Sequence, residues 1–271
     1  MENPTEIIPG VIFYSYLSEK RKEKVCFFEH STLVLQVDGE FNLKTTSQKI
    51  SMQKGEMLLI RKNQLAELIK IPGDSGSYQT IVLCLHEELL RTIALEEKIG
   101  LTQKYLGEPN ILIPSNDYLS GYFESIVPYV QHSEEKLAKS LGLLKVKEAV
   151  QLLLYTKSEL KEALFDFSEP HKINLEKFMM SNFHYNIPLE QFARLTGRSL
   201  ASFKRDFQKS FGESPRQWLQ KKRLNEARYL IEKKGLKPSV IYLDLGFESL
   251  SHFSHAFKKE FGIAPSKWFA A

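Results

Sequence analysis

The chain has 271 residues, of which 42% are hydrophobic, so it is long enough to form two domains with buried cores. Its net charge of +4 is unevenly divided: residues 169–271 hold 18 Lys and Arg against 10 Asp and Glu, whereas residues 1–168 hold 19 against 23. The basic C-terminal part favours a polyanionic partner, although a solvated surface gives the same count. No run of about 18 uncharged apolar residues exists, so we expect no membrane span.

The two cysteines, Cys26 and Cys84, each stand in an apolar run. This setting is typical of small buried hydrophobic residues, and a structural disulfide is the less favoured alternative. The opening residues carry neither the basic nor the apolar stretch of a secretory leader, so we expect a reduced protein in the cytoplasm.

Short β-rich runs separated by turn residues occupy the first third of the chain. The runs are residues 11–14, 32–37, 41–43, 57–60 and 78–85. Asp38-Gly39 fits a hairpin between two of them, Lys54-Gly55 precedes another, and residues 72–76 form a longer loop. Several short strands at this spacing predict a small barrel or sandwich.

Helical patterns follow from residue 87. We expect helices over residues 87–99, from about Tyr118 behind the capping residues 115–117, and over about 134–165. Apolar positions of the last helix are Leu137, Leu141, Leu144, Ala149, Leu152, Leu153 and Leu160. Two roles fit this stripe: packing against the β-rich region or, in a regulator, a seam between two copies of the chain.

An internal duplication at an offset of fifty residues is the most informative feature of the sequence. Residues 188–218 match residues 238–268 without a gap at 11 of 31 positions. Chance matching gives roughly two identities in such a window, so the repeat is not an accident of composition. The matched pairs are Pro188/Pro238, Leu195/Leu245, Ser199/Ser249, Leu200/Leu250, Phe203/Phe253, Phe207/Phe257, Lys209/Lys259, Phe211/Phe261, Gly212/Gly262, Pro215/Pro265 and Trp218/Trp268.

Each copy has the pattern of a helix-turn-helix. A first short helix (189–195; 239–245) precedes a glycine-containing turn, and a serine then caps a second helix. Leu200, Phe203 and Phe207 in one copy, and Leu250, Phe253 and Phe257 in the other, share an inward stripe. The residues that face outward or flank this outward face are Ala201, Ser202, Lys204, Arg205, Gln208 and Lys209 in the first copy, and Ser251, His252, Ser254, His255, Lys258 and Lys259 in the second.

Polar or basic faces that begin with small residues suit insertion into the DNA major groove. A helix over residues 215–234 would join the two units, so that they address successive grooves. We expect Trp218, Leu219, Leu224, Ala227, Leu230 and Ile231 to face inward on this helix, and Lys221, Lys222, Arg223 and Arg228 to face solvent or the DNA backbone. An ordinary small helical domain, serving as a protein-binding module, is the alternative.

Residues 175–268 resemble the DNA-binding domain of the AraC/XylS family of transcription regulators. The resemblance rests on residues 227–231 and 245–266, and the first unit matches less closely at Thr196-Gly197-Arg198. Base readers in the family lie two residues before and after the central apolar residue of each recognition helix. This implies Ala201 and Arg205, then Ser251 and His255, with Lys204 and Ser254 beside them. Backbone contacts fall to Ser199, Ser202, Gln208, Lys209, Ser249, His252, Lys258 and Lys259.

The N-terminal part resembles the family more weakly, through Gly55-Glu56-Met57-Leu58-Leu59-Ile60, which is similar to a cupin motif. The resemblance implies an α+β chain of two domains. Residues 1–168 would form a cupin-like β-barrel with trailing helices, similar in outline to ExsA-like regulators, and residues 169–271 an all-α domain with units at about 188–218 and 238–268. It implies double-stranded promoter DNA as partner, and leaves open a homodimer through the N-terminal helices and a small-molecule or protein effector.

The main rival is a cupin enzyme. Cupin metal sites need several histidines and a carboxylate, yet only His30 and His86 lie in the β-rich region, and Gln64-Leu65-Ala66 stands where a third histidine would follow. His252 and His255 lie one helical turn apart and are a weaker candidate for zinc. No Gly-x-Ser-x-Gly elbow occurs. We therefore expect no enzyme activity, cofactor or metal.

Overall fold

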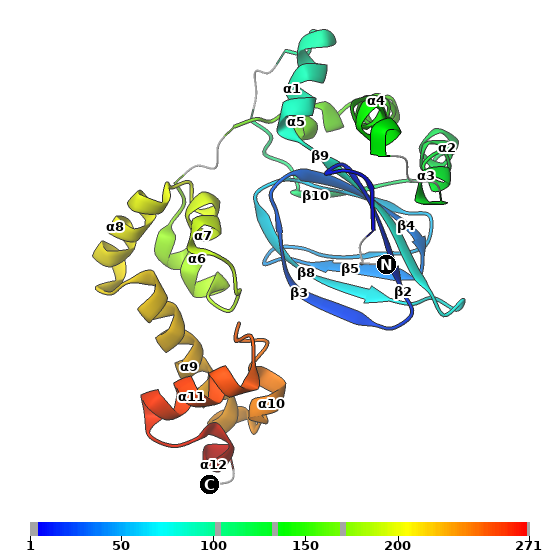
Figure 1. Ribbon diagram of the computed structural model, residues 1–271. Coiled ribbons are helices and arrows are strands. Elements are labelled where there is room, and N and C mark those ends of the chain that lie inside the picture. Colours follow the sequence, from blue (N-terminus) through cyan, green and yellow to red (C-terminus); the bar gives the residue numbers. More distant parts are fainter. Residues whose placement is uncertain (1–4, 101–103, 132–134, 169–171, 270–271) are drawn as a thin grey trace. The chain divides into compact units, whose positions relative to one another are not determined.

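The computed structural model describes residues 5–100, 104–131, 135–168 and 172–269, and leaves out the side chains of residues 22–25, 130–131 and 135–140. The chain divides into two compact units, Met1–Ser168 and Glu169–Ala271, which we describe separately. The first contains the strands and the second is helical (Figure 1). Among the described residues, no helix has both the length and the apolar character needed to cross a bilayer.

Antiparallel strands form two sheets in the N-terminal unit. The six-stranded sheet has the order β1-β2-β9-β4-β7-β10, and the four-stranded sheet has the order β3-β8-β5-β6. The strands are β1 (Thr5–Ile8), β2 (Ile12–Leu17), β3 (Arg21–Phe28), β4 (Ser31–Asp38), β5 (Glu40–Lys44), β6 (Lys49–Met52), β7 (Met57–Ile60), β8 (Gln64–Ile71), β9 (Tyr78–Leu85) and β10 (Asn110–Ile113).

The six-stranded sheet is buried on both faces at β4 and β7, which explains the continuous apolar runs of these two strands. Leu33 and Leu59 belong to the core that the sheet shares with the helices, whereas Val34 and Leu58 belong to the core that it shares with the four-stranded sheet. Successive strand residues point to opposite faces of the sheet, so a strand that is buried on both faces needs apolar residues at every position. A strand with one solvent-facing side would alternate apolar and polar residues. The unit is therefore built as sheet, sheet and helices (Figure 1).

The expected sheet-rich domain with trailing helices is confirmed, but the closed barrel is wrong. In the described residues the strand pairings stay within each sheet, so both sheets are open. The predicted hairpin at Asp38-Gly39 is also wrong, because β4 and β5 lie in different sheets. Gly39 makes this crossing with φ +78°, and a Cβ there would lie 2.5 Å from the Ile71 carbonyl oxygen, so only glycine fits.

The helices in the described residues of this unit are α1 (Glu87–Glu96), α2 (Asp117–Glu124), α3 (Val127–Gln131), α4 (Glu135–Thr156) and α5 (Leu160–Leu164). The predicted cap of α2 is confirmed, since the Asn116 side chain accepts a hydrogen bond from the Leu119 backbone. The long helix predicted to reach residue 165 ends earlier. The Thr156 hydroxyl donates to the Leu152 carbonyl and accepts from Asn116, and a turn separates α4 from α5.

Most of the described stripe of α4 packs against the sheet and neighbouring helices. Ala149 and Leu153 are fully buried, and Leu141 and Leu152 are half-buried against the same core. Leu144 is 60% exposed, so of the two roles considered for the stripe it does not take the packing role. The side chain of Leu137 lies outside the described residues. The two cysteines are half-buried thiols that form no disulfide, and burial raises the pKa of the Cys84 thiol to about 11.

The C-terminal unit contains two helix-turn-helix units joined by one long helix. The first is α6 (Leu175–Asn182), α7 (Leu189–Leu195) and α8 (Leu200–Phe211); α9 (Pro215–Lys234) follows; the second is α10 (Pro238–Ile241), α11 (Leu250–Phe261) and α12 (Pro265–Phe269). The predicted bounds of α7 and α9 are confirmed, whereas α10 is shorter than expected. A Ser214–Gln217 capping box begins α9, and Gly235 in the left-handed conformation ends it.

The duplication reappears as two similar aromatic cores. In the first, Phe207 contacts Phe203, Phe211 and Trp218 with ring centroids 4.4–5.6 Å apart. In the second, Phe257 contacts Phe253, Phe261 and Trp268 at 4.6–5.7 Å. Both central phenylalanines are fully buried. Edge-to-face and tilted pairs of this kind add to the stability that burial provides, so each core fixes the axis of its recognition helix.

Candidate nucleic-acid interface

The second helix of each unit, α8 or α11, begins at a serine and ends at a glycine. The Ser199 side chain accepts a hydrogen bond from the Ser202 backbone, and Ser249 accepts one from His252. Gly212 and Gly262 end the helices with φ +72° and +79°. Because both ends are defined by local chemistry, the side chains between them occupy matching positions in the two units.

The apolar side of each helix is buried as predicted at its two central phenylalanines, but its first residue is not. Leu200 is half-buried and Leu250 is 40% exposed. The first turn of each helix therefore extends beyond the core. A projecting first turn is the part of a recognition helix that reaches base edges.

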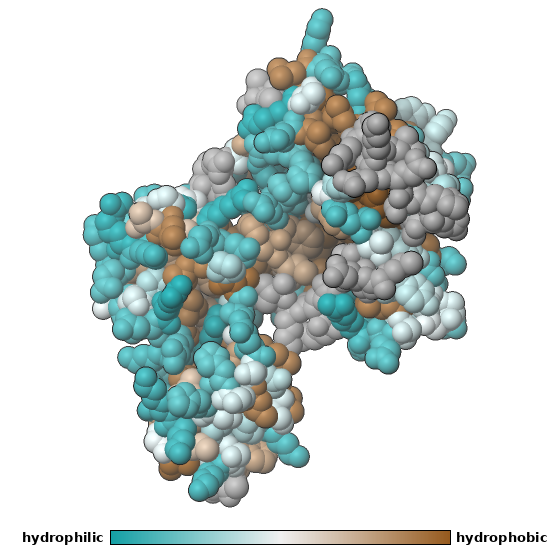
Figure 2. All heavy atoms as spheres, viewed as in Figure 1, coloured by the Kyte–Doolittle hydropathy of each residue, from teal (hydrophilic) through white to brown (hydrophobic). Residues whose placement is uncertain are grey.

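The predicted DNA-contacting residues lie together on the solvent side of α8 and α11. All of them are exposed except Ser202 and Ser254, which are half-buried; the exposed members are Ser199, Ala201, Lys204, Arg205, Gln208 and Lys209 in the first unit, and Ser249, Ser251, His252, His255, Lys258 and Lys259 in the second. On the face of the helical unit that is visible in Figure 2, hydrophilic residues predominate. Their individual roles toward DNA stay predictions.

One acidic side chain on α8 is neutralised within the protein. Asp206 accepts a hydrogen bond from Arg198 at 3.0 Å and lies 3.8 Å from the Lys172 ammonium group. The bond from Arg198, with the nearby cations, holds the pKa of Asp206 below its usual range. Arg198 also donates to the Ile173 and Thr196 carbonyls. The carboxylate is thus paired with cations of the protein itself.

Arg223 was expected to face solvent or DNA, and this is wrong. Its guanidinium donates to the carbonyls of Phe183 at 2.8 Å, Tyr185 at 2.7 Å and Gly246 at 3.2 Å. Burial lowers the pKa of Arg223 to about 10. One side chain of α9 therefore holds the segment before α7 and the turn before α11.

The sequence contained a signal for this role. Leu219, Arg223 and Ala227 are four residues apart, so Arg223 lies on a buried stripe of α9. The turn that it contacts has no room for a side chain: Gly246 has φ +78°, and a Cβ there would lie 2.5 Å from the His184 carbonyl oxygen. Asn186 donates to Glu248 at 3.2 Å and adds a direct bond between the two helix-turn-helix units.

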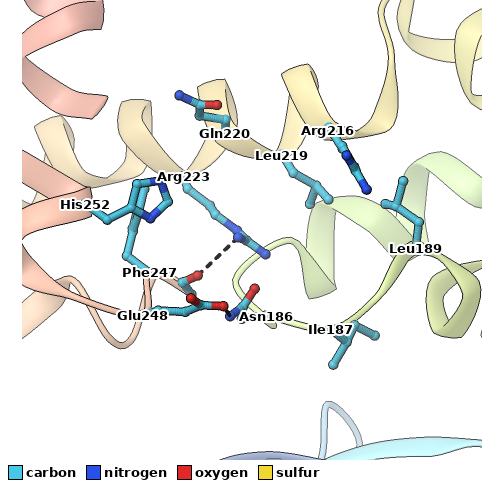
Figure 3. Close-up of a pocket in the computed structure, with 11 residues that line it drawn as sticks. Asn186, Ile187, Leu189, Arg216, Leu219, Gln220, Arg223, Phe247, Glu248 and His252 are labelled. Atoms are coloured by element: carbon cyan, nitrogen blue, oxygen red, sulfur yellow. Dashed lines mark hydrogen bonds between the residues drawn. The ribbon is translucent and has the colours of Figure 1, made fainter. Parts of the chain in front are cut away.

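A cavity of about 480 Å³ opens at this junction (Figure 3). It lies among the segment before α7, helix α9, the turn before α11 and the first turn of α11. Its polar lining consists of Asn186, Arg216, Gln220, Arg223, Glu248 and His252. A small pocket in the N-terminal unit, beside His30, Lys62 and Glu87, has a volume of about 10 Å³. In the described part of the chain, no three His, Cys, Asp or Glu side chains cluster as metal ligands would.

Comparison with known proteins identifies the family. Residues 31–167 match the ExsA N-terminal regulatory domain, and this match alone spans just over half of the chain. Residues 192–271 match a helix-turn-helix domain. The chain belongs to the AraC-type transcription regulators. Among the relatives of this AraC-type regulator is VirF of Yersinia enterocolitica, a virulence regulon transcriptional activator, 27% identical over 82% of this chain and 83% of the relative.

Other similar proteins also match over most of the chain. The HTH-type transcriptional regulator ExsA of Pseudomonas aeruginosa is 23% identical over 87% of this chain and 81% of its own. Among solved structures, an apo single-residue variant of ToxT from Vibrio cholerae covers 100% of this AraC-type regulator and 99% of its own chain, with 14% identity and a TM-score of 0.48. The sequence relatives place the regulator among DNA-binding transcription regulators with an N-terminal regulatory domain.

Proposed function

We propose that this AraC-type regulator binds a bipartite promoter site of about 17 to 20 base pairs, with α8 and α11 in successive major grooves. The observation that carries the proposal is the matched pair of exposed helix faces on two similar aromatic cores. Ala201, Lys204 and Arg205 would read bases in one groove, and Ser251, Ser254 and His255 in the other. Arg205 suits guanine, and the Ala201 methyl group suits a thymine methyl.

The remaining polar residues of these helices would contact phosphates. Their hydroxyl, amide, imidazole and ammonium groups fix the register of a protein on the duplex without reading sequence. These residues are Ser199, Ser202, Gln208, Lys209, Ser249, His252, Lys258 and Lys259. The net charge of +8 in residues 169–271 supports a phosphate-binding role, because each neutralised phosphate releases counterions.

The test is selection of random duplex DNA by the full-length protein, followed by binding of the selected sequence at several salt concentrations. We expect two boxes whose centres are about 10 base pairs apart, and an affinity that falls steeply with salt. A single box, or no enrichment by either the full-length protein or residues 169–271, would contradict bipartite reading. Enrichment by the fragment alone would mean that the N-terminal unit inhibits binding.

We infer that the N-terminal unit acts as an effector-responsive module in the cytoplasm, with no catalytic role, and that the regulator activates transcription. Its match to a regulatory domain and the activator among its relatives support this assignment. A small-molecule or protein effector would change the affinity for the selected duplex through this unit. Reporter expression from the selected site, with and without the regulator, tests activation, and repression would contradict it.

We further propose a homodimer through α2 and α4. Leu144 and Tyr155 of α4 are 60% and 74% exposed, and they are eleven residues apart, which places them on one helix face. Tyr118 of α2 is 60% exposed and contacts the Tyr155 ring at 5.6 Å. Sedimentation of the full-length protein should give a dimer that Leu144→Glu dissociates and Leu106→Glu, a change at an exposed loop position, does not. A monomeric parent would refute the dimer.

A further inference from the structure

We propose that the cavity between the two helix-turn-helix units is a phosphate site for the DNA segment that separates the two boxes. The inference rests on the proposed bipartite binding and adds a third contact region to it. The ligand is a backbone phosphate, recognised through Arg216, and the site reads no base.

The cationic groups of the cavity differ in what they already bind. The Arg223 guanidinium is used by three carbonyl oxygens of the protein. Arg216 lies seven residues earlier on the same face of α9 and is exposed, and within the described residues its guanidinium has no hydrogen-bond or ion-pair partner. Figure 3 shows both arginines extending from the same side of α9. The Arg223 guanidinium therefore stabilises the backbone that forms the cavity wall, and the Arg216 guanidinium is available to a ligand.

The acidic group of the cavity is also engaged. Glu248 accepts a hydrogen bond from Asn186 on the side of the cavity formed by the segment before α7. The lining contains two guanidinium groups, those of Arg216 and Arg223, and one carboxylate, that of Glu248, so these groups sum to a net positive charge. An anion is favoured over a cation in such a site.

His252 connects the cavity to the DNA-binding face. It stands in the first turn of α11, its ring lies 5.7 Å from the Phe247 ring, and it lines the cavity. The adjacent residue, Ser251, is a predicted base reader. A duplex that places its bases against Ser251 carries its phosphates past His252, because each strand bears one phosphate per about 3.4 Å of helix axis.

The cavity lies between the parts that would read the two boxes. Its walls include the segment before α7 of the first unit and the turn of the second unit. DNA that is bound by both units must run across the junction between them. The spacer between the boxes is the part that the recognition helices do not contact. A contact to its backbone would favour one spacer geometry without specifying a spacer sequence.

The experiment pairs a protein change with a neutral phosphate. Arg216→Gln should weaken binding to the selected two-box duplex about tenfold and reduce the slope of log affinity against log salt by about 1. Methylphosphonate substitution of the central spacer phosphates should weaken binding of the parent to a similar extent. The same substitution should leave the affinity of Arg216→Gln unchanged, because the partner charge is already gone.

Lys233→Gln is the matched control. Lys233 is exposed near the C-terminal end of α9, about 25 Å along the helix from Arg216, and it does not line the cavity. If Arg216→Gln and the methylphosphonate duplex reduce affinity additively when combined, the proposal is overturned. Equal losses of affinity in Arg216→Gln and the control variant would also overturn it. Failure of the parent to bind any two-box duplex would instead refute the bipartite function.

A titration with inorganic phosphate distinguishes a site for DNA phosphate from a site for a small free anion. Inorganic phosphate, titrated at constant ionic strength into the full-length protein without DNA, should not shift the His252 ring resonances at millimolar concentration. A saturable shift that Arg216→Gln abolishes would assign the cavity to a free anion and overturn the assignment to DNA.

Discussion

Replacing Arg223 with methionine tests whether one side chain joins the two helix-turn-helix units. Methionine keeps an apolar stem but removes the donors to the Phe183, Tyr185 and Gly246 carbonyls. Hydrogen bonds from a charged donor contribute about 1.5–3 kcal/mol each. Burial opposes them, since lowering the pKa of Arg223 from 12.5 to about 10 corresponds to about 3 kcal/mol. For three such bonds, we expect a net loss of about 1.5–6 kcal/mol in the free energy of unfolding of the helical unit.

The two tryptophans make this loss measurable in the full-length protein. Trp218 and Trp268 are the only tryptophans of the chain, and both lie in the helical unit, one in each aromatic core. Denaturant unfolding followed by tryptophan fluorescence therefore reports this unit alone. Lys221→Met, at an exposed position of the same helix, should change stability by less than about 0.5 kcal/mol. If Arg223→Met costs no more than this control, the three hydrogen bonds do not stabilise the unit.

Three further predictions concern single residues. Arg205→Ala should cost about 1–3 kcal/mol on the selected duplex and relax specificity in one groove, whereas Lys258→Ala should weaken specific and random DNA alike; equal losses for Arg205→Ala on both DNAs would contradict base reading. Gly246→Ala should lower stability by at least about 2 kcal/mol more than Gly262→Ala, because both glycines have positive φ but only Gly246 faces a backbone oxygen; equal effects would contradict the steric argument. Asp166→Asn should reduce stability above about pH 4 and have a shrinking effect below it; a difference that does not vary with pH would refute the ion-pair explanation.

The sign of the last prediction follows from the surroundings of Asp166. Burial works to raise the pKa of Asp166, but hydrogen bonds from the Ser168 hydroxyl and backbone and from Arg61 outweigh it, so the pKa lies below its usual range. The Arg61–Asp166 pair measures 2.6 Å. A carboxyl whose pKa is lowered by folding contributes stability above its unfolded pKa, and that contribution is lost as pH falls through the folded value. Acid titration of the parent and the Asn variant by circular dichroism measures it.

The sequence predicted the helical unit well because its signals are local. Serine caps, terminal glycines and the phenylalanine spacing define α8 and α11 without reference to distant residues. The long helix α9 was equally clear, with Ser214 and Pro215 at its start and Gly235 at its end. The repeat then assigned both helices the same role.

The β-rich unit was harder to predict because its pairings join distant residues. The segment that forms β8, Gln-Leu-Ala-Glu-Leu-Ile-Lys-Ile, is rich in helix-forming residues, and it becomes a strand through pairing with β3 and β5. Where β4 and β5 separate, the Gly39 backbone lies against the carbonyl of Ile71, which is 32 residues away. Such long-range contacts override the local turn signal.

The predicted helix faces had one weakness, which was the assumption that basic residues are exposed and apolar residues are buried. Arg223 is basic but serves the protein interior, and Leu250 is apolar but projects from the start of α11. Periodicity alone assigns a face to each residue, whereas the junction between the two units is visible only in three dimensions. The cavity beside Arg216 had no signal in the linear pattern for the same reason.

The two helix-turn-helix units share a core but not a reading surface. Ala201 and Arg205 of one unit correspond to Ser251 and His255 of the other, and the turns also differ, with the left-handed glycine at Gly197 in one and at Gly246 in the other. A single chain bound through both units would therefore recognise a site with two distinguishable ends. Such a site would have a direction on the promoter, defined by which box takes α8 and which takes α11.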